Sequence, residues 1–282
     1  MNSLELLKRS NIITWWYAFL VCIISSFLQG ITFDYIFNPI ITDKLIASLI
    51  SFISSLVFIL LYVKFFEKNS LKTLGFKNSS IFKSISIGFF LAISAVFIII
   101  STMVTLTDVK ISVSDENNYK VLFLVIILFT IQGFTEEIVF RGYLMNRIAA
   151  LKGKWMGVFI NSLFFTIFHI TNQSSSYLSS LNIYVIGVVL SLIFWYTDNI
   201  IIVGIFHGTW NFIIGLVLGI NLSGINMPYS IFKTSLNSNN SVITGGNFGI
   251  EASIITTIFF IIFGIVIYIG LYFQMFKRFN KN

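Results

Sequence analysis

The chain has 282 residues, of which 56% are apolar and only 10% charged, and its mean hydropathy is +0.91. Soluble domains carry about a quarter charged residues, so this composition excludes a soluble domain and indicates a polytopic membrane protein. The net charge of +7 comes from Lys and Arg that lie between apolar stretches, a pattern typical of membrane-protein loops and not of a nucleic-acid-binding surface.

Eight apolar stretches predict transmembrane helices, which together give an all-α bundle that forms one integral domain over residues 1–282. A helix needs about 20 residues to cross ~30 Å of hydrocarbon, and the fifth and sixth stretches are short by that measure. In chain order, the stretches are 11–32, 45–65, 84–107, 121–146, 155–171, 181–196, 200–220 and 252–276.

The loops between these stretches predict the orientation. With a cytoplasmic N-terminus, 13 of the 18 Lys and Arg residues fall on the cytoplasmic side and four on the outer side, with Arg141 set aside inside the membrane. This asymmetry follows the positive-inside rule. We therefore expect a multi-pass protein of the cell membrane with both termini cytoplasmic, a basic cytoplasmic connector at 67–84 and an external loop at 221–251. The N-terminus leads into a full-length span, so no cleavable signal peptide is expected.

The fourth stretch contains three ionisable residues in "GFTEEIVFRGY" (133–143). Glu136, Glu137 and Arg141 together would cost on the order of 8–10 kcal/mol if they faced lipid unpaired, so they must face the protein interior. Glu137 and Arg141 stand at i and i+4 on one helical face, which predicts an ion pair. Glu136 is rotated about 100° away, so it is left without that partner.

The two histidines of the chain lie in other apolar stretches. His169 ends "FFTIFH", four residues after Phe165, and His207 begins "HGTWN", four residues before Asn211. His207 and Asn211 share a helical face. A carboxylate that accepts a proton, beside imidazoles and an amide that donate hydrogen bonds, favours activation of water and stabilisation of an oxyanion. Glu251, at the start of the last helix, is assigned a structural role.

"EEIVFR" (136–141), "FTIFH" (165–169) and "HGTWN" (207–211) resemble the three motifs of the CAAX protease and bacteriocin-processing family, also called the Abi family. All three occur in order, in separate apolar stretches, with no departure at a motif position. "TGGNFGIEAS" is similar to a segment of bacterial members. The resemblance covers about residues 121–253, which it implies to be the catalytic core, and the first three stretches are generic.

The resemblance implies an eight-helix intramembrane endopeptidase whose cavity opens to the membrane and the cytoplasm. It assigns Glu136 as the general base, His169 as a residue that positions the water, and His207 with Asn211 as the oxyanion hole. Supporting roles fall to three further residues: Glu137, Arg141 and Phe165.

Cofactor use is open from the sequence, because members of the family are described both as metalloproteases and as metal-free glutamate proteases. A zinc ion is conceivable on Glu136, His169 and His207. We expect no metal, since His207 and Asn211 are already assigned to the oxyanion and Asn is a poor zinc ligand. The single cysteine, Cys22, excludes both a disulfide within the chain and a metal site built from cysteines.

The expected partners are a peptide or membrane-protein substrate and the lipid bilayer, with no nucleic acid. The resemblance also indicates a bacterial source, which disfavours a prenylated CAAX substrate. Two other classes of function stay open at this stage. The first is a non-catalytic scaffold or bacteriocin-immunity protein that retains the motifs. The second is a proton-coupled transporter, for which the sequence lacks paired Gly- or Pro-broken helices.

Overall fold

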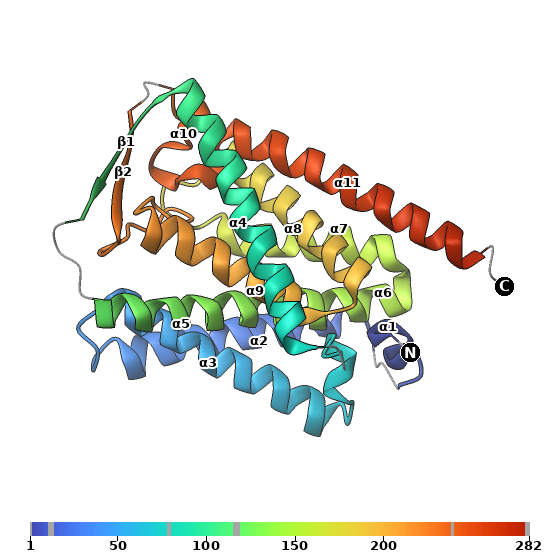
Figure 1. The fold of residues 1–282 in the computed structure, drawn as a ribbon. Helices are drawn as coiled ribbons and strands as arrows, with labels where there is room; N and C mark the ends of the chain where they lie inside the picture. Colours follow the sequence, from blue (N-terminus) through green and yellow to red (C-terminus); the bar gives the residue numbers. More distant parts are fainter. Residues whose placement is uncertain (1, 11–13, 78–79, 115–118, 238–239, 280–282) are drawn as a thin grey trace.

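The structure, a computed structural model, describes residues 2–10, 14–77, 80–114, 119–237 and 240–279. Long helices pack beside one another, and the helix over Ile81–Leu106 crosses the view at a steep angle to the others (Figure 1). Their outer faces carry many exposed Phe, Ile, Val and Leu side chains, such as Phe97 and Phe273, which are 69% and 58% exposed. An apolar outer surface around long helices is the arrangement of a polytopic membrane bundle, and the predicted fold class is confirmed.

Long helices overlap each of the predicted apolar stretches. They are α2 (Tyr17–Thr32), α3 (Lys44–Leu61), α4 (Ile81–Leu106), α5 (Tyr119–Glu137), α7 (Lys154–His169), α8 (Tyr177–Thr197), α9 (Ile200–Phe212) and α11 (Ile254–Phe279). Shorter helices are α1 (Ser3–Lys8), α6 (Asn146–Lys152) and α10 (Ser241–Thr244). Four π-helical turns are η1 (Phe33–Phe37), η2 (Tyr62–Phe66), η4 (Ile138–Met145) and η5 (Ile213–Val217), and three 3-10 turns are η3 (Leu71–Leu74), η6 (Gly246–Phe248) and η7 (Ile250–Ala252). Helix α2 begins six residues later than predicted, and the helical turns η4 and η5 continue α5 and α9 to near the predicted ends.

Within the described part of the chain, seven helical segments are long and apolar enough to cross a membrane. The predicted stretch at 155–171 corresponds to α7, whose 16 residues fall short of that length. The predicted stretch at 181–196 is longer in the structure, because α8 extends over 21 residues. The number of eight spans therefore stays a prediction that depends on α7.

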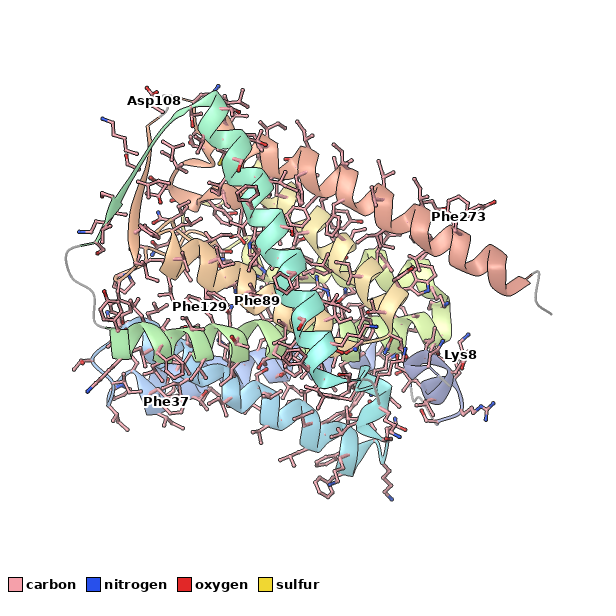
Figure 2. The ribbon with its side chains drawn as sticks, in the orientation of Figure 1. Lys8, Phe37, Phe89, Asp108, Phe129 and Phe273 are labelled. Atoms are coloured by element: carbon pink, nitrogen blue, oxygen red, sulfur yellow. The ribbon has the colours of Figure 1, made fainter. Side chains whose placement is uncertain are left out.

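A two-stranded antiparallel ribbon is an element that the sequence analysis did not predict. Strand β1 (Asp108–Val113) follows α4 and pairs with β2 (Phe232–Asn237), with Asp108 opposite Asn237 and Val113 opposite Phe232. The ribbon joins the α4–α5 connection to the segment between α9 and α11. It lies at one end of the bundle, and α1, α6 and the C-terminal end of α11 lie at the other (Figure 1). Figure 2 labels Lys8 at one end and Phe37 and Asp108 at the opposite end.

Helices α5 and α9 cross in backbone contact. A Cβ atom at Gly133 would lie 2.4 Å from the backbone nitrogen of Gly208, and a Cβ at Gly208 would lie 2.7 Å from the Cα of Thr130. Only glycine permits this approach. Because Gly133 precedes the glutamates and Gly208 follows His207, the crossing brings these two motifs together.

A largely buried ion pair between Glu67 and Arg147 lies at the end of the bundle that holds α6. Arg147 Nη2 lies 2.5 Å from Glu67 Oε2, and the Arg147 guanidinium stacks 3.8 Å from the ring centre of Tyr143, whose hydroxyl donates to Glu67 at 2.9 Å. Burial alone would raise the pKa of Glu67, but the Arg147 charge, with hydrogen bonds from Arg147, Tyr143 and Asn69, lowers the pKa below its ordinary value. The pair fixes the end of η2 against η4 and α6.

The N-terminal helix α1 packs against this end of the bundle. Asn2 caps the helix by accepting from the Glu5 backbone N–H, while the Glu5 side chain accepts from the Asn2 N–H. The backbone N–H and hydroxyl of Ser3 donate to the carboxylate of Asp198, which occupies the left-handed turn that ends α8. Asn146 donates to the hydroxyl of Ser3 at 3.1 Å. These contacts join α1, α6 and α8.

Candidate active site

The ion pair predicted within the fourth stretch is present. Arg141 Nη1 lies 2.8 Å from Glu137 Oε1, and both side chains are fully buried. Arg141 Nη2 also donates to the carbonyl of Gly187 on α8 at 3.2 Å, and the guanidinium lies 4.5 Å from the ring centre of Phe165 on α7. The pair therefore joins α5 and η4 to α7 and α8.

Glu137 has a second partner that spacing along the chain did not reveal. Its Oε1 atom accepts from Nδ1 of His207 at 2.9 Å, across the contact between α5 and α9. The other ring nitrogen, Nε2, lies 3.7 Å from Glu136 Oε2. His207 thus stands between the two glutamates, with its ring orientation fixed by the one that also pairs with Arg141.

Glu136 is held by Gln132, a residue that the sequence analysis missed. Gln132 Nε2 donates to Glu136 Oε1 at 2.9 Å, and Gln132 Oε1 accepts from Asn211 Nδ2 at 2.8 Å. Gln132 therefore connects the predicted base to the predicted oxyanion donor. Its sequence signal is its place four residues before Glu136 in an apolar stretch. Glu136 Oε2 is buried and has no hydrogen-bond partner among the described residues.

His169 is oriented by its own helix. Its Nδ1 atom lies 2.8 Å from the carbonyl oxygen of Phe165. A carbonyl only accepts, so Nδ1 carries a proton, and in the neutral ring Nε2 is an acceptor. The Phe165 ring lies 4.5 Å from the His169 ring and 6.2 Å from the His207 ring. Phe165 therefore packs between Arg141 and both histidines, and its supporting role stays a prediction.

A cavity of about 270 Å³ unites the predicted residues. Among the residues that line it are Glu136, His169, His207, Asn211 and Gln132. They come from α5, α7 and α9, so the fold brings together side chains from three motifs that are separated by up to 75 residues of chain. The catalytic role of each of these residues stays a prediction.

The cavity extends toward the end of the bundle that carries the β1–β2 ribbon. Its lining includes Leu45 at the start of α3, Asn172 after the end of α7, and Ser223 in the segment after α9. The distribution of Lys and Arg predicts this end to be external. The resemblance implies a cavity that opens to the cytoplasm, so the two expectations conflict, because a cytoplasmic N-terminus places this end of the cavity on the outer side.

Glu251 lies in η7, just before α11, as predicted. Its carboxylate bonds to groups of other segments and not to the N-terminal backbone of α11. Its Oε1 accepts from Trp210 Nε1 at 3.0 Å, and its Oε2 accepts from the backbone and hydroxyl of Ser223 at 2.8 and 2.5 Å. Trp210 is next to Asn211 on α9. Glu251 therefore anchors the loop wall of the cavity to the helix that carries the predicted oxyanion donor.

The geometry does not fit the zinc ion considered for Glu136, His169 and His207. No group of three His, Cys, Asp or Glu side chains among the described residues is arranged to hold a metal ion. Nδ1 of each histidine is engaged, by Phe165 in one case and Glu137 in the other. Nε2 of each ring stays open, as it does in most histidine ligands of metals, so the misfit rests on the arrangement of the side chains and not on the engaged Nδ1 atoms.

Comparison with known protein families bears on this site directly. Residues 118–213 match the family model of Rce1-like type II CAAX prenyl endopeptidases. The resemblance predicted from the three motifs is thereby confirmed, and the Rce1-like match implies a protease. The Rce1-like segment runs from α5 to the start of η5 and contains all three motifs. No curated protein matches the chain.

Proposed function

We propose that the protein is an intramembrane endopeptidase that hydrolyses peptide bonds of membrane-bound or membrane-adjacent peptides with a water molecule activated by Glu136. One observation carries the proposal. Glu136 is fixed through Oε1 by Gln132, while its buried Oε2 has no hydrogen-bond partner among the described residues and faces His207 Nε2 across 3.7 Å, in the cavity that His169 and Asn211 also line.

In the proposed reaction, Glu136 Oε2 accepts a proton from the water as the oxygen attacks the peptide carbonyl. His169 Nε2 accepts the second hydrogen bond of that water and so orients it. The C–N bond then breaks, and the proton held by Glu136 passes to the leaving amine. One water molecule is consumed for each bond cleaved.

The oxyanion that forms on the peptide carbonyl needs hydrogen-bond donors. Asn211 Nδ2 has two N–H groups, and one of them is engaged with Gln132. The second is the proposed donor. His207 Nδ1 donates to Glu137, so a contribution from Nε2 requires the doubly protonated ring. Glu137 then acts by orienting His207, and Arg141 acts by holding Glu137.

Hydrolysis is tested with purified protein in lipid vesicles, a mixture of synthetic apolar peptides and water enriched in ¹⁸O. We expect new fragment pairs in which the new carboxyl terminus carries one ¹⁸O atom, with Glu136→Gln as the matched control that produces none. Cleavage should persist in the presence of a chelator, since we propose chemistry without a metal. Activity that is lost on chelation and restored by zinc would contradict the metal-free mechanism.

The same experiment separates the endopeptidase from a scaffold or immunity protein, which would bind peptides without producing fragments. We further propose that the protein is bacterial and that both of its termini are cytoplasmic. The 13-to-4 distribution of Lys and Arg supports the orientation.

A further inference from the structure

The part of the cavity formed by α2 and α3 lies outside the segment that matches the family model. Residues 118–213 supply the motif residues, yet α2 and α3 also contribute several lining side chains. The polar ones are Ser26, Gln29, Ser48 and Ser55. The sequence of these helices carries none of the three motifs, and the family match does not include them, so neither assigns these side chains a role.

Three of these polar side chains lack hydrogen-bond partners among the described residues. Ser55 is already satisfied, because its hydroxyl lies 2.6 Å from the hydroxyl of Ser25. By contrast, across the residues that the structure describes, the hydroxyls of Ser26 and Ser48 and the amide of Gln29 make no hydrogen bond. All three residues are partly exposed. Ser26 and Gln29, at i and i+3, lie on the same face of α2.

An extended peptide needs partners of this kind. In a helix the carbonyl of each residue accepts from the N–H four residues later, so a peptide bond must leave the helix before its carbonyl can enter the oxyanion site. Inside a membrane the freed N–H and C=O groups have no water to bond to. A hydroxyl and a carboxamide each donate and accept, so they can pair with both backbone groups.

The charge of the cavity favours a neutral ligand. The lining includes no Lys or Arg side chain among the described residues, and Glu136 is the acidic residue that faces it. A ligand recognised by its negative charge would find no Lys or Arg side chain to pair with among the described lining residues. Backbone groups of an uncharged segment match the amide and hydroxyls instead.

We infer that Ser26, Gln29 and Ser48 form a peptide-binding subsite that holds the extended, uncharged backbone of the substrate across the cavity from α2 and α3 while Glu136 acts on it. This inference rests on the proposed function and adds a binding site to it. The subsite recognises backbone groups, so the site tolerates different uncharged side chains beside the cleaved bond.

The test uses an end-blocked, uncharged peptide chosen from the vesicle experiment because its cleavage depends on Glu136. Gln29→Leu and Ser48→Ala should each lower kcat/KM roughly 3- to 10-fold, as the loss of one neutral hydrogen bond does, mainly through KM. Ser94→Ala is the matched control, because Ser94 is exposed on α4 and its hydroxyl donates to its own helix at Phe90. It should leave kcat/KM unchanged.

A second set of peptides separates binding from a structural effect. In each peptide one backbone N–H near the cleaved bond is replaced by an ester oxygen. At the position that donates to Gln29, the ester should weaken cleavage by the wild type but have no further effect on Gln29→Leu. Equal ester penalties in both proteins at every position, or an unchanged kcat/KM in both variants, would overturn the inference. If the wild type shows no Glu136-dependent cleavage of any peptide, the proposed function itself fails.

Discussion

Replacing Arg141 with Ala should destabilise the protein more than almost any other single substitution outside the apolar core. The substitution leaves Glu137 fully buried without its 2.8 Å partner, and it removes the hydrogen bond to Gly187 and the stacking on Phe165. Loss of one member of a buried ion pair typically costs about 3–5 kcal/mol. For a chain of this size, each kcal/mol lowers Tm by roughly 2–4 °C, so we expect a decrease of roughly 6–20 °C.

The measurement is thermal unfolding of detergent-purified protein, followed by helical circular dichroism. Arg9→Ala is the matched control, because Arg9 is exposed just after α1 and surface substitutions usually change stability within about 0.5 kcal/mol. Arg141→Lys should fall between the two, since lysine keeps the charge but lacks the planar fork. If Arg141→Ala unfolds within 2 °C of the wild type, the pair is solvated and does not support the site.

Three further predictions concern the positioning of the site, the Glu67–Arg147 ion pair and the orientation. Gln132→Leu should lower kcat by roughly 10- to 100-fold with little change in Tm, because it releases both groups that Gln132 holds; an unchanged kcat would show that Gln132 does not position them. Because the pKa of Glu67 is lowered in the folded protein, its stabilising contribution is complete above the unfolded-state pKa of ~4.3 and is lost as the pH falls through the folded-state pKa. Between about pH 5 and 3, the Tm of Glu67→Gln should therefore decrease less than the Tm of the wild type. Equal decreases of Tm would contradict this. An impermeant thiol reagent should label Lys233→Cys but not Lys77→Cys in intact cells, since the one native cysteine is buried; the reverse pattern would place the N-terminus outside.

Much of the bundle was predictable because apolar length and i,i+4 spacing are local signals. The Glu137–Arg141 pair formed as expected, since both partners lie on one helical face whatever surrounds them. The long helices follow the apolar stretches because the backbone of a membrane span must satisfy its own hydrogen bonds. The grouping of His169, His207 and Asn211 with Glu136 was favoured by the chemistry of polar residues inside apolar stretches, and the family resemblance assigned each of them a role.

Other features depend on tertiary contacts that no local pattern reports. The hydrogen bond from His207 to Glu137 joins residues 70 positions apart, and it follows from the Gly133–Gly208 crossing. In the sequence, Gln132 is a polar residue in an apolar stretch, and only the fold places Asn211 within hydrogen-bond distance of it. Residues 108–113 (DVKISV) do alternate polar and apolar residues, but the segment is short and its partner strand lies more than 100 positions away in the sequence, so the β1–β2 ribbon was missed.

The central claim, that Glu136 activates the attacking water, is tested most directly by single-turnover cleavage of a validated peptide by Glu136→Gln. Glutamine keeps the shape and a hydrogen bond to Gln132 but cannot accept the proton. We expect a rate at least about 10²–10⁴-fold below that of the wild type, with Tm and peptide binding nearly unchanged. A Glu136→Gln protein that cleaves the peptide at the wild-type rate would contradict the mechanism.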